Sequence, residues 1–126
     1  MISRIWHGWT TPGNADAYEA LLETEIFHSI AARQIAGFRG IQLLRREIGP
    51  IGDIGDVGGS GGSGGIGGLG GEVEFVTVMR FDSLDAVRAF AGEDYEVAVV
   101  PPQARALLAR FDARSQHYEV RIEREA

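Results

Sequence analysis

Cysteine and lysine are both absent from this sequence of 126 residues. Without cysteine, neither a disulfide framework nor a thiolate metal site can form. All 12 basic side chains are arginine, which excludes Schiff-base chemistry, a pyridoxal anchor and the lysine of a phosphate-binding loop. Positive charge is also in deficit, because 18 acidic residues give a formal net charge of −6. This balance argues against nucleic acid and against an anionic membrane surface as the main partner.

Long apolar runs are missing as well. The first ten residues contain no run of the kind found in signal peptides, and no later stretch is long enough to span a bilayer. We therefore expect a cytoplasmic protein with no membrane partner. Apolar residues make up 44% of the chain and charged residues 24%, which is typical of globular proteins. The length predicts a single domain over residues 1–126.

Alternation and turn residues predict four strands, because these stretches are rich in β-branched and aromatic residues. The strands are predicted at Ile2–Thr10 and in the stretches that begin at Phe38, Glu72 and Arg114.

Helical spacing predicts two main helices between these strands. The first follows Asn14 as its N-cap and carries an apolar stripe that includes Tyr18 and Leu22. The second follows Asp82 as its cap and stops at Gly92, and a further helical turn begins after Pro101. The order βαββαβ predicts a ferredoxin-like α+β domain, with helices on one face of an antiparallel sheet.

The other face of the predicted sheet has no helices to cover it. Val76 and Val78 share one face of the third strand, and Ile41 and Leu43 add apolar side chains from the second. Because the chain offers no second layer of helices, we expect another subunit to cover this face and predict a homodimer.

Residues 49–71 interrupt the domain between the second and third strands. Every triplet from Gly49 begins with glycine, and most third positions are apolar. A polyproline-II-type helix has three residues per turn, so these apolar side chains would fall along one edge. Two alternatives stay open: paired extended rods that act as a packing or interaction element, and a featureless Gly/Ser loop.

Nearly all of the chain outside residues 49–71 resembles the antibiotic biosynthesis monooxygenase family. The stretches that carry the resemblance are IWHGWTTPGNADAYEALLETEIF, GFRGIQLLRR, EVEFVTVMRFDSLDAVRAFAGEDYEVAVVPP and ARFDARSQHYEVR. The resemblance implies a dimeric α+β barrel with a pocket between the sheet and its helices. By position, it implies substrate-binding roles for Trp6, Phe81, Phe90 and Tyr95. The second helical region lacks the iron-ligating histidine of heme-degrading relatives, which argues against heme degradation.

The residues with candidate catalytic chemistry are Tyr118, His7 and His117. If the first and last strands pair antiparallel with Ile2 opposite Ile122, then His7 lies opposite His117, and Tyr118 shares a face with Trp6. Two alternatives stay open for the histidine pair. With a neighbouring carboxylate it binds a metal or shares a proton, or it forms hydrogen bonds across the subunit interface.

Several aromatic side chains could line a pocket for a flat substrate, with core packing as the alternative. The set consists of Trp6, Phe75, Phe81, Phe90, Tyr95 and Tyr118.

The leading hypothesis is a cofactor-independent monooxygenase that acts on a phenolic or polycyclic aromatic small molecule. Once deprotonated, such a substrate gives an electron to dioxygen by itself, so the protein need only bind it, desolvate it and place a base. Neither a metal nor a cofactor is expected, because no nucleophile elbow, zinc motif or dinucleotide fingerprint is present. The alternative is a non-enzymatic dimer that binds a small molecule or serves as a scaffold.

Overall fold

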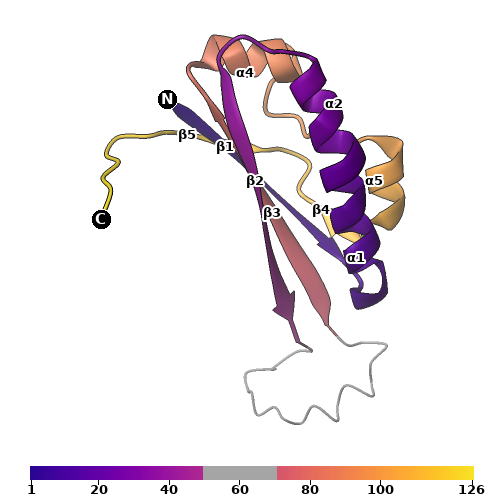
Figure 1. Ribbon diagram of the computed structural model, residues 1–126. Helices are drawn as coiled ribbons and strands as arrows, with labels where there is room; N and C mark the ends of the chain where they lie inside the picture. Colours follow the sequence, from indigo (N-terminus) through magenta and orange to yellow (C-terminus); the bar gives the residue numbers. More distant parts are fainter. Residues whose placement is uncertain (50–70) are drawn as a thin grey trace.

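The computed structural model describes residues 1–49 and 71–126. Within them the chain forms an α+β fold around one antiparallel sheet (Figure 1). The strand order is β2-β3-β1-β4, and β5 also pairs with β1. The strands are β1 Ile2–Thr10, β2 Phe38–Ile48, β3 Glu72–Phe81, β4 Arg110–Phe111 and β5 Gln116–Glu119. The first three strands confirm the sequence prediction. The polyproline-type rods predicted for residues 49–71 fall almost wholly in residues 50–70, outside the described residues.

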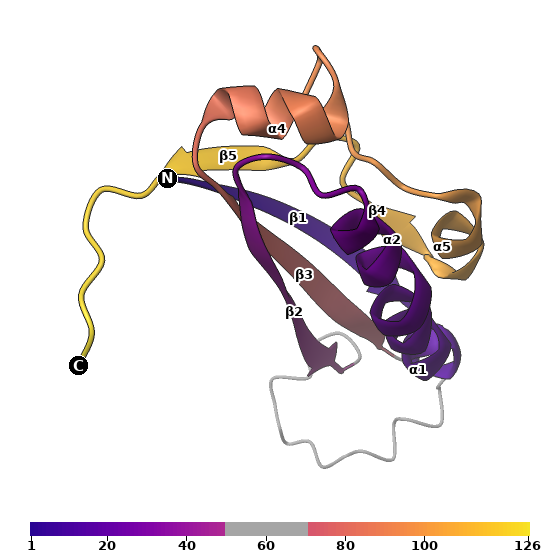
Figure 2. The ribbon, with the colours of Figure 1, turned by 45° about the horizontal axis from the view of Figure 1, so that its top comes forward.

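Three helical segments of the described chain cover one face of this sheet. The first is continuous and consists of α1 (Pro12–Leu21), a π-helical stretch η1 (Leu22–Ile26) and α2 (Phe27–Ala32). The others are α4 (Leu84–Ala91) and α5 (Pro102–Leu107). Figure 2 shows α4 over the end of the sheet where β1 begins, with the first helix and α5 at the other end. None of the described helices is long and apolar enough to cross a membrane.

The first helix begins earlier than predicted. Thr11 is its N-cap, with an extended backbone and a side chain that accepts a hydrogen bond from the Asn14 N–H. The cause is Pro12, because a residue before proline avoids the helical region and proline itself suits the first helical position. The predicted cap, Asn14, lies inside the helix, where its side-chain amide donates to the Leu107 carbonyl of α5 at 3.2 Å.

The predicted cap of α4 is also wrong by one residue. Ser83 is the N-cap, and its hydroxyl accepts a hydrogen bond from the Ala86 N–H at 3.2 Å. Asp82 instead accepts a hydrogen bond from Arg39 at 2.7 Å, so its carboxylate is not available to the helix. Gly92 follows the last turn at a positive φ of 96°, as expected for a glycine that ends a helix.

The core consists of two clusters on the helix-covered face of the sheet. Alternate residues of β3 supply both clusters, because successive strand residues point to opposite faces. Val73 and Phe75 pack against the first helix and α5, whereas Met79 and Phe81 pack against α4. Thr77 lies between the two pairs on the same face of β3. The cavity described below lies at this gap.

The opposite face of the sheet carries no helix from the described residues. Val76 and Val78 lie on it, as predicted, and Leu44 of β2 pairs with Val76. Ile41 and Leu43 point toward the helices, since they pair with inward-facing residues of β3 and pack against the two clusters. The prediction that placed them on the uncovered face is therefore wrong, because the register of β2 puts Ile41 opposite Met79 and Leu43 opposite Thr77.

Candidate functional site

A cavity lies between the sheet and the first helix, at the gap between the two core clusters. Its volume is about 60 Å³, and a second space of about 260 Å³, the outer groove, adjoins it. Ile26, Ile30 and Phe90 border both spaces, so the two lie side by side. The wall of the inner cavity includes Arg4, Trp6, Tyr18, Phe27, Thr77 and Ser115. A mostly apolar wall with a few polar groups is typical of small-molecule sites.

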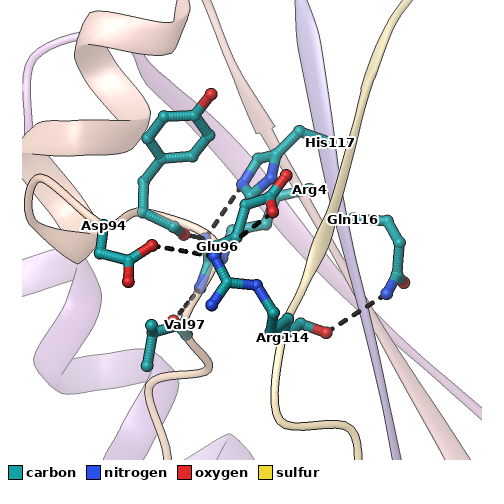
Figure 3. A network of polar contacts seen from close by, with 8 residues as sticks. Arg4, Asp94, Glu96, Val97, Arg114, Gln116 and His117 are labelled. Atoms are coloured by element: carbon teal, nitrogen blue, oxygen red, sulfur yellow. Dashed lines mark hydrogen bonds and ion pairs between the residues drawn. The ribbon is translucent and has the colours of Figure 1, made fainter.

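Arg4 is the charged residue of this wall. Alternation along β1 places it on the same face as Trp6, and only 3% of it is exposed. Its Nη1 donates to the Tyr95 carbonyl and to His117 Nε2, the latter at 3.0 Å (Figure 3). Its Nη2 donates to the Val97 carbonyl at 3.3 Å. The loop between α4 and α5 therefore fixes the guanidinium with backbone carbonyls.

No carboxylate among the described residues forms an ion pair with Arg4. Glu96, which acts on Arg4 electrostatically, pairs with Arg114 at 3.5 Å, and Arg114 also bonds to Asp94 at 2.9 Å (Figure 3). Burial lowers the pKa of Arg4 to about 10, against a smaller raising effect of Glu96. The guanidinium is therefore still charged at neutral pH.

His117 is held in one protonation state by this contact. Arginine can only donate, so Nε2 of His117 accepts and the ring proton is on Nδ1. Burial lowers the pKa of His117, and the charge of Arg4 lowers it further. The buried Nδ1 has no hydrogen-bond partner among the described residues. The imidazole is thus neutral at neutral pH and acts as an acceptor for Arg4.

Two of the four predicted substrate-binding residues line the cavity. Trp6 does so with its ring fixed, because its Nε1 donates to the Asp112 carbonyl at 2.7 Å, and Phe90 borders both spaces. Phe81 is fully buried in the α4 cluster, and its ring lies 5.5 Å from that of Phe38.

The fourth predicted substrate-binding residue, Tyr95, and a further aromatic candidate, Phe75, have other surroundings. Tyr95 is not among the residues that line either space. Its ring lies edge-on to that of His117 at 5.0 Å, and its carbonyl accepts from Arg4. Phe75 is a core residue and packs edge-on against Tyr18 at 4.8 Å.

The predicted register of the last strand is wrong. Ile2 lies opposite Glu119, so His117 lies opposite Arg4 and Tyr118 lies opposite Ser3. The predicted strand ran on from Arg114, but the strand pairs with β1 only over Gln116–Glu119, after the chain has left the sheet between β4 and β5. There the Ser115 N–H donates to the Glu96 carbonyl at 2.6 Å. An odd displacement exchanges the two faces of a strand.

The three catalytic candidates are consequently not brought together. His117 is on the cavity side of the sheet behind Arg4, and His7 and Tyr118 are on the uncovered face. Tyr118 is 55% exposed. The described residues also contain no group of three His, Asp or Glu side chains that could hold a metal ion. Neither the shared proton nor the metal alternative for His7 and His117 agrees with this placement.

His7 forms part of a different polar group. Its Nδ1 donates to Glu74 at 2.9 Å, and Arg46 donates to the other carboxylate oxygen at 2.6 Å. Burial opposes ionisation of Glu74, but the hydrogen bonds from His7 and Arg46 outweigh it and lower the pKa of the carboxyl group. Trp9 lies next to His7, with ring centroids 6.0 Å apart. This group lies on the uncovered face of the sheet.

Sequence reasoning missed Arg4. The available signal was its spacing from Trp6, because residues two apart on a strand share a face. If Trp6 faces the helices, a cation two residues away on the same strand faces them too. Because arginine is rarely buried in a protein core, such a position indicates a functional role.

No protein-family model matches the chain, and no curated protein sequence matches it significantly.

Proposed function

We propose that this chain is a cofactor-independent monooxygenase that acts on a phenolic or polycyclic aromatic small molecule in the cavity described above. The observation that supports it is the composition of the cavity wall. The cavity wall includes the Arg4 guanidinium and few other polar groups. The rest of the wall is largely aromatic, with the rings of Trp6, Tyr18, Phe27 and Phe90. A flat ring with one ionisable oxygen is complementary to such a wall.

The proposal includes the finer fold class. A ferredoxin-like topology of the dimeric α+β barrel type agrees with the strand order β2-β3-β1-β4, the antiparallel pairing and the helices on a single face. The sequence resemblance to antibiotic biosynthesis monooxygenases points the same way. Fold alone does not determine the reaction, so the argument for activity rests on the cavity.

In the proposed reaction, the substrate supplies its own electrons. A phenolate transfers electrons to dioxygen, one oxygen atom enters the ring as a quinone carbonyl, and the other leaves as water with two hydrogens of the substrate. The protein binds the ring, excludes water and favours the ionised form. Tyr118 and His7 would not serve as bases in this scheme because they lie on the other face of the sheet.

Oxygen consumption tests this proposal. Purified protein should consume oxygen in a saturable manner with at least one member of a panel of naphthols, hydroquinones and anthrones, above the rate of autoxidation. Addition of a chelator should not change the rate. Heat-denatured protein and the variant Phe90→Ala serve as controls, since both should return the rate toward the background. Absence of uptake with the whole panel would overturn the oxygenase and favour the alternative, a protein that only binds or assembles.

We also propose that the protein is a homodimer joined through the uncovered face of the sheet. This face carries an apolar centre that includes Ile5, Leu44, Val76 and Val78. Leu44 is 47% exposed, and together with its apolar neighbours it leaves an apolar patch in contact with water, which is unfavourable. Polar groups surround the centre, among them Arg110, which stacks on the Trp9 ring at 3.9 Å and pairs with Glu72 at 2.9 Å. An apolar centre with a polar rim is the usual anatomy of an interface.

Light scattering combined with size-exclusion chromatography tests the dimer. The wild-type chain should have the mass of two copies at micromolar concentration, and Val78→Glu should have the mass of one. Ala17→Glu adds the same charge at an exposed position of α1 and should remain dimeric. A monomeric wild type, or a dimer that Val78→Glu leaves intact while its circular dichroism is unchanged, would contradict the proposal.

A further inference from the structure

Arg4 differs from the other arginines of the described chain because it is buried and forms no ion pair there. Seven others pair with a carboxylate, and they are Arg39, Arg45, Arg46, Arg88, Arg110, Arg114 and Arg121. Arg4 is nearly fully buried, and its three acceptors are two backbone carbonyls and a histidine nitrogen. A buried charge is costly unless an opposite charge accompanies it. The fold therefore retains a buried cation that forms no direct ion pair with a carboxylate of the described residues, although Glu96 acts on it electrostatically.

The neighbours of Arg4 cannot become that counter-charge. His117 is neutral or, when protonated, positive, so it adds no negative charge. Burial raises the pKa of the Tyr18 hydroxyl above its ordinary value, so this phenol stays protonated. Thr77 and Ser115 add only hydroxyl groups. Glu96 favours the charged guanidinium without an ion pair to it, because its carboxylate pairs with Arg114 instead. A negative charge in direct contact with the guanidinium must therefore come from a bound molecule.

The rest of the wall indicates which molecule this is. The Phe90 ring lies near two cations, since the guanidinium carbons of Arg4 and Arg33 are each 5.3 Å from its centroid. Trp6 and Phe27 add further aromatic surface. The inner cavity suits a small charged group, and the larger outer groove suits the ring system attached to it. Guanidinium groups recognise carboxylates and phenolates through charge-assisted hydrogen bonds.

We infer that the cavity binds a planar aromatic anion, a phenolate or an aryl carboxylate, with its charged oxygen at Arg4 beside Trp6 and its ring along Phe90 in the outer groove. The inference rests on the proposed function in one respect, because it names the ligand class of the same cavity. For a phenolic substrate it also assigns the ionisation step. Arg4 stabilises the phenolate, and the proton passes to solvent as the ligand binds, so no separate base is required. His117 is then a positioning residue that holds Arg4.

Calorimetry under nitrogen tests the inference without turnover. The probes are 2-naphthoate and its neutral counterpart 2-naphthamide, which share a ring system and differ in charge. The wild type should bind the anion about tenfold or more tightly than the amide. Arg4→Gln should remove this preference. Arg33→Gln, which removes an equal charge at the outer groove, should retain it.

A second measurement decides the matter if Arg4→Gln does not fold. Absorbance titration of 2-naphthol with the wild type should show the phenol pKa lowered by at least about one unit in the complex, because a neighbouring cation favours the ionised form. Equal affinity for naphthoate and naphthamide, an unshifted naphthol pKa, or loss of the preference in Arg33→Gln alone would each overturn the inference. Anion preference without oxygen uptake would leave the anion site intact and overturn only the oxygenase.

Discussion

Phe81 provides a stability test of the division between the core and the cavity. The residue is fully buried, and its ring lies 5.5 Å from that of Phe38 and 5.9 Å from that of Phe90. It does not line the cavity. Phe81→Ala should therefore lower the free energy of unfolding by about 3–5 kcal/mol, as expected when a packed ring is removed and its space is only partly refilled. It should change the affinity for 2-naphthoate by no more than about twofold, because no ligand contact is lost.

Phe90→Ala is the matched comparison, because this ring borders the cavity and the groove. Its loss should weaken 2-naphthoate binding about tenfold or more, since burial of one aromatic side chain is worth about 1.5–3 kcal/mol. Urea unfolding followed by tryptophan fluorescence gives both stabilities, at one protein concentration because a dimer is concentration-dependent. If Phe81→Ala does not fold, Phe81→Leu should lose about 1 kcal/mol. Weaker ligand binding by a Phe81 variant of undiminished stability would refute the separation of core and cavity.

Two further predictions concern the uncovered face and the helix caps. Glu74→Gln should lower the free energy of unfolding by about 1–2 kcal/mol at pH 7. His7 and Arg46 favour the ionised form of Glu74, and the nearby Arg110 has a weaker effect in the same direction. The difference in unfolding free energy between the variant and the wild type should therefore be constant above the ordinary glutamate pKa. It should vanish as the pH falls through the lowered pKa of the folded state. A difference that persists in acid would refute this assignment, and urea unfolding across pH 3–7 measures it. Ser83→Ala should cost about 1 kcal/mol in thermal or urea unfolding, and Asp82→Asn should cost less. A larger loss of stability in Asp82→Asn than in Ser83→Ala would instead indicate that Asp82 caps the helix.

The first three strands were predictable because their evidence is local. Residues alternate or cluster by type within each stretch, and glycine or proline marks the ends. The helix caps were less accurate, because two neighbouring residues can both cap a helix and the choice depends on other contacts. At α4, Asp82 is engaged by Arg39 from β2, which is a contact between residues far apart in sequence. Ser83 is therefore left to cap the helix.

The site was harder to predict because it depends on register. The last strand is divided between β4 and β5, and the division is fixed by hydrogen bonds to the loop after α4. Alternation within the C-terminal stretch carries no information about that loop. The resulting error exchanged the faces of His117 and Tyr118, so the predicted base was assigned to the wrong side of the sheet. The aromatic wall was partly predictable, since the positions that the family resemblance implied include Trp6 and Phe90, which line the cavity.

The alternation of β1 also explains how one strand contributes to two separate surfaces. Arg4 and Trp6 point toward the helices and line the cavity, whereas His7 and Trp9 point to the uncovered face. β1 lies between β3 on one side and β4 and β5 on the other, so its backbone is fixed along both edges. A substitution on one face therefore changes one surface and leaves the other in place. Variants of Arg4 report on ligand binding, and variants of the uncovered face report on assembly, so the two proposals can fail independently.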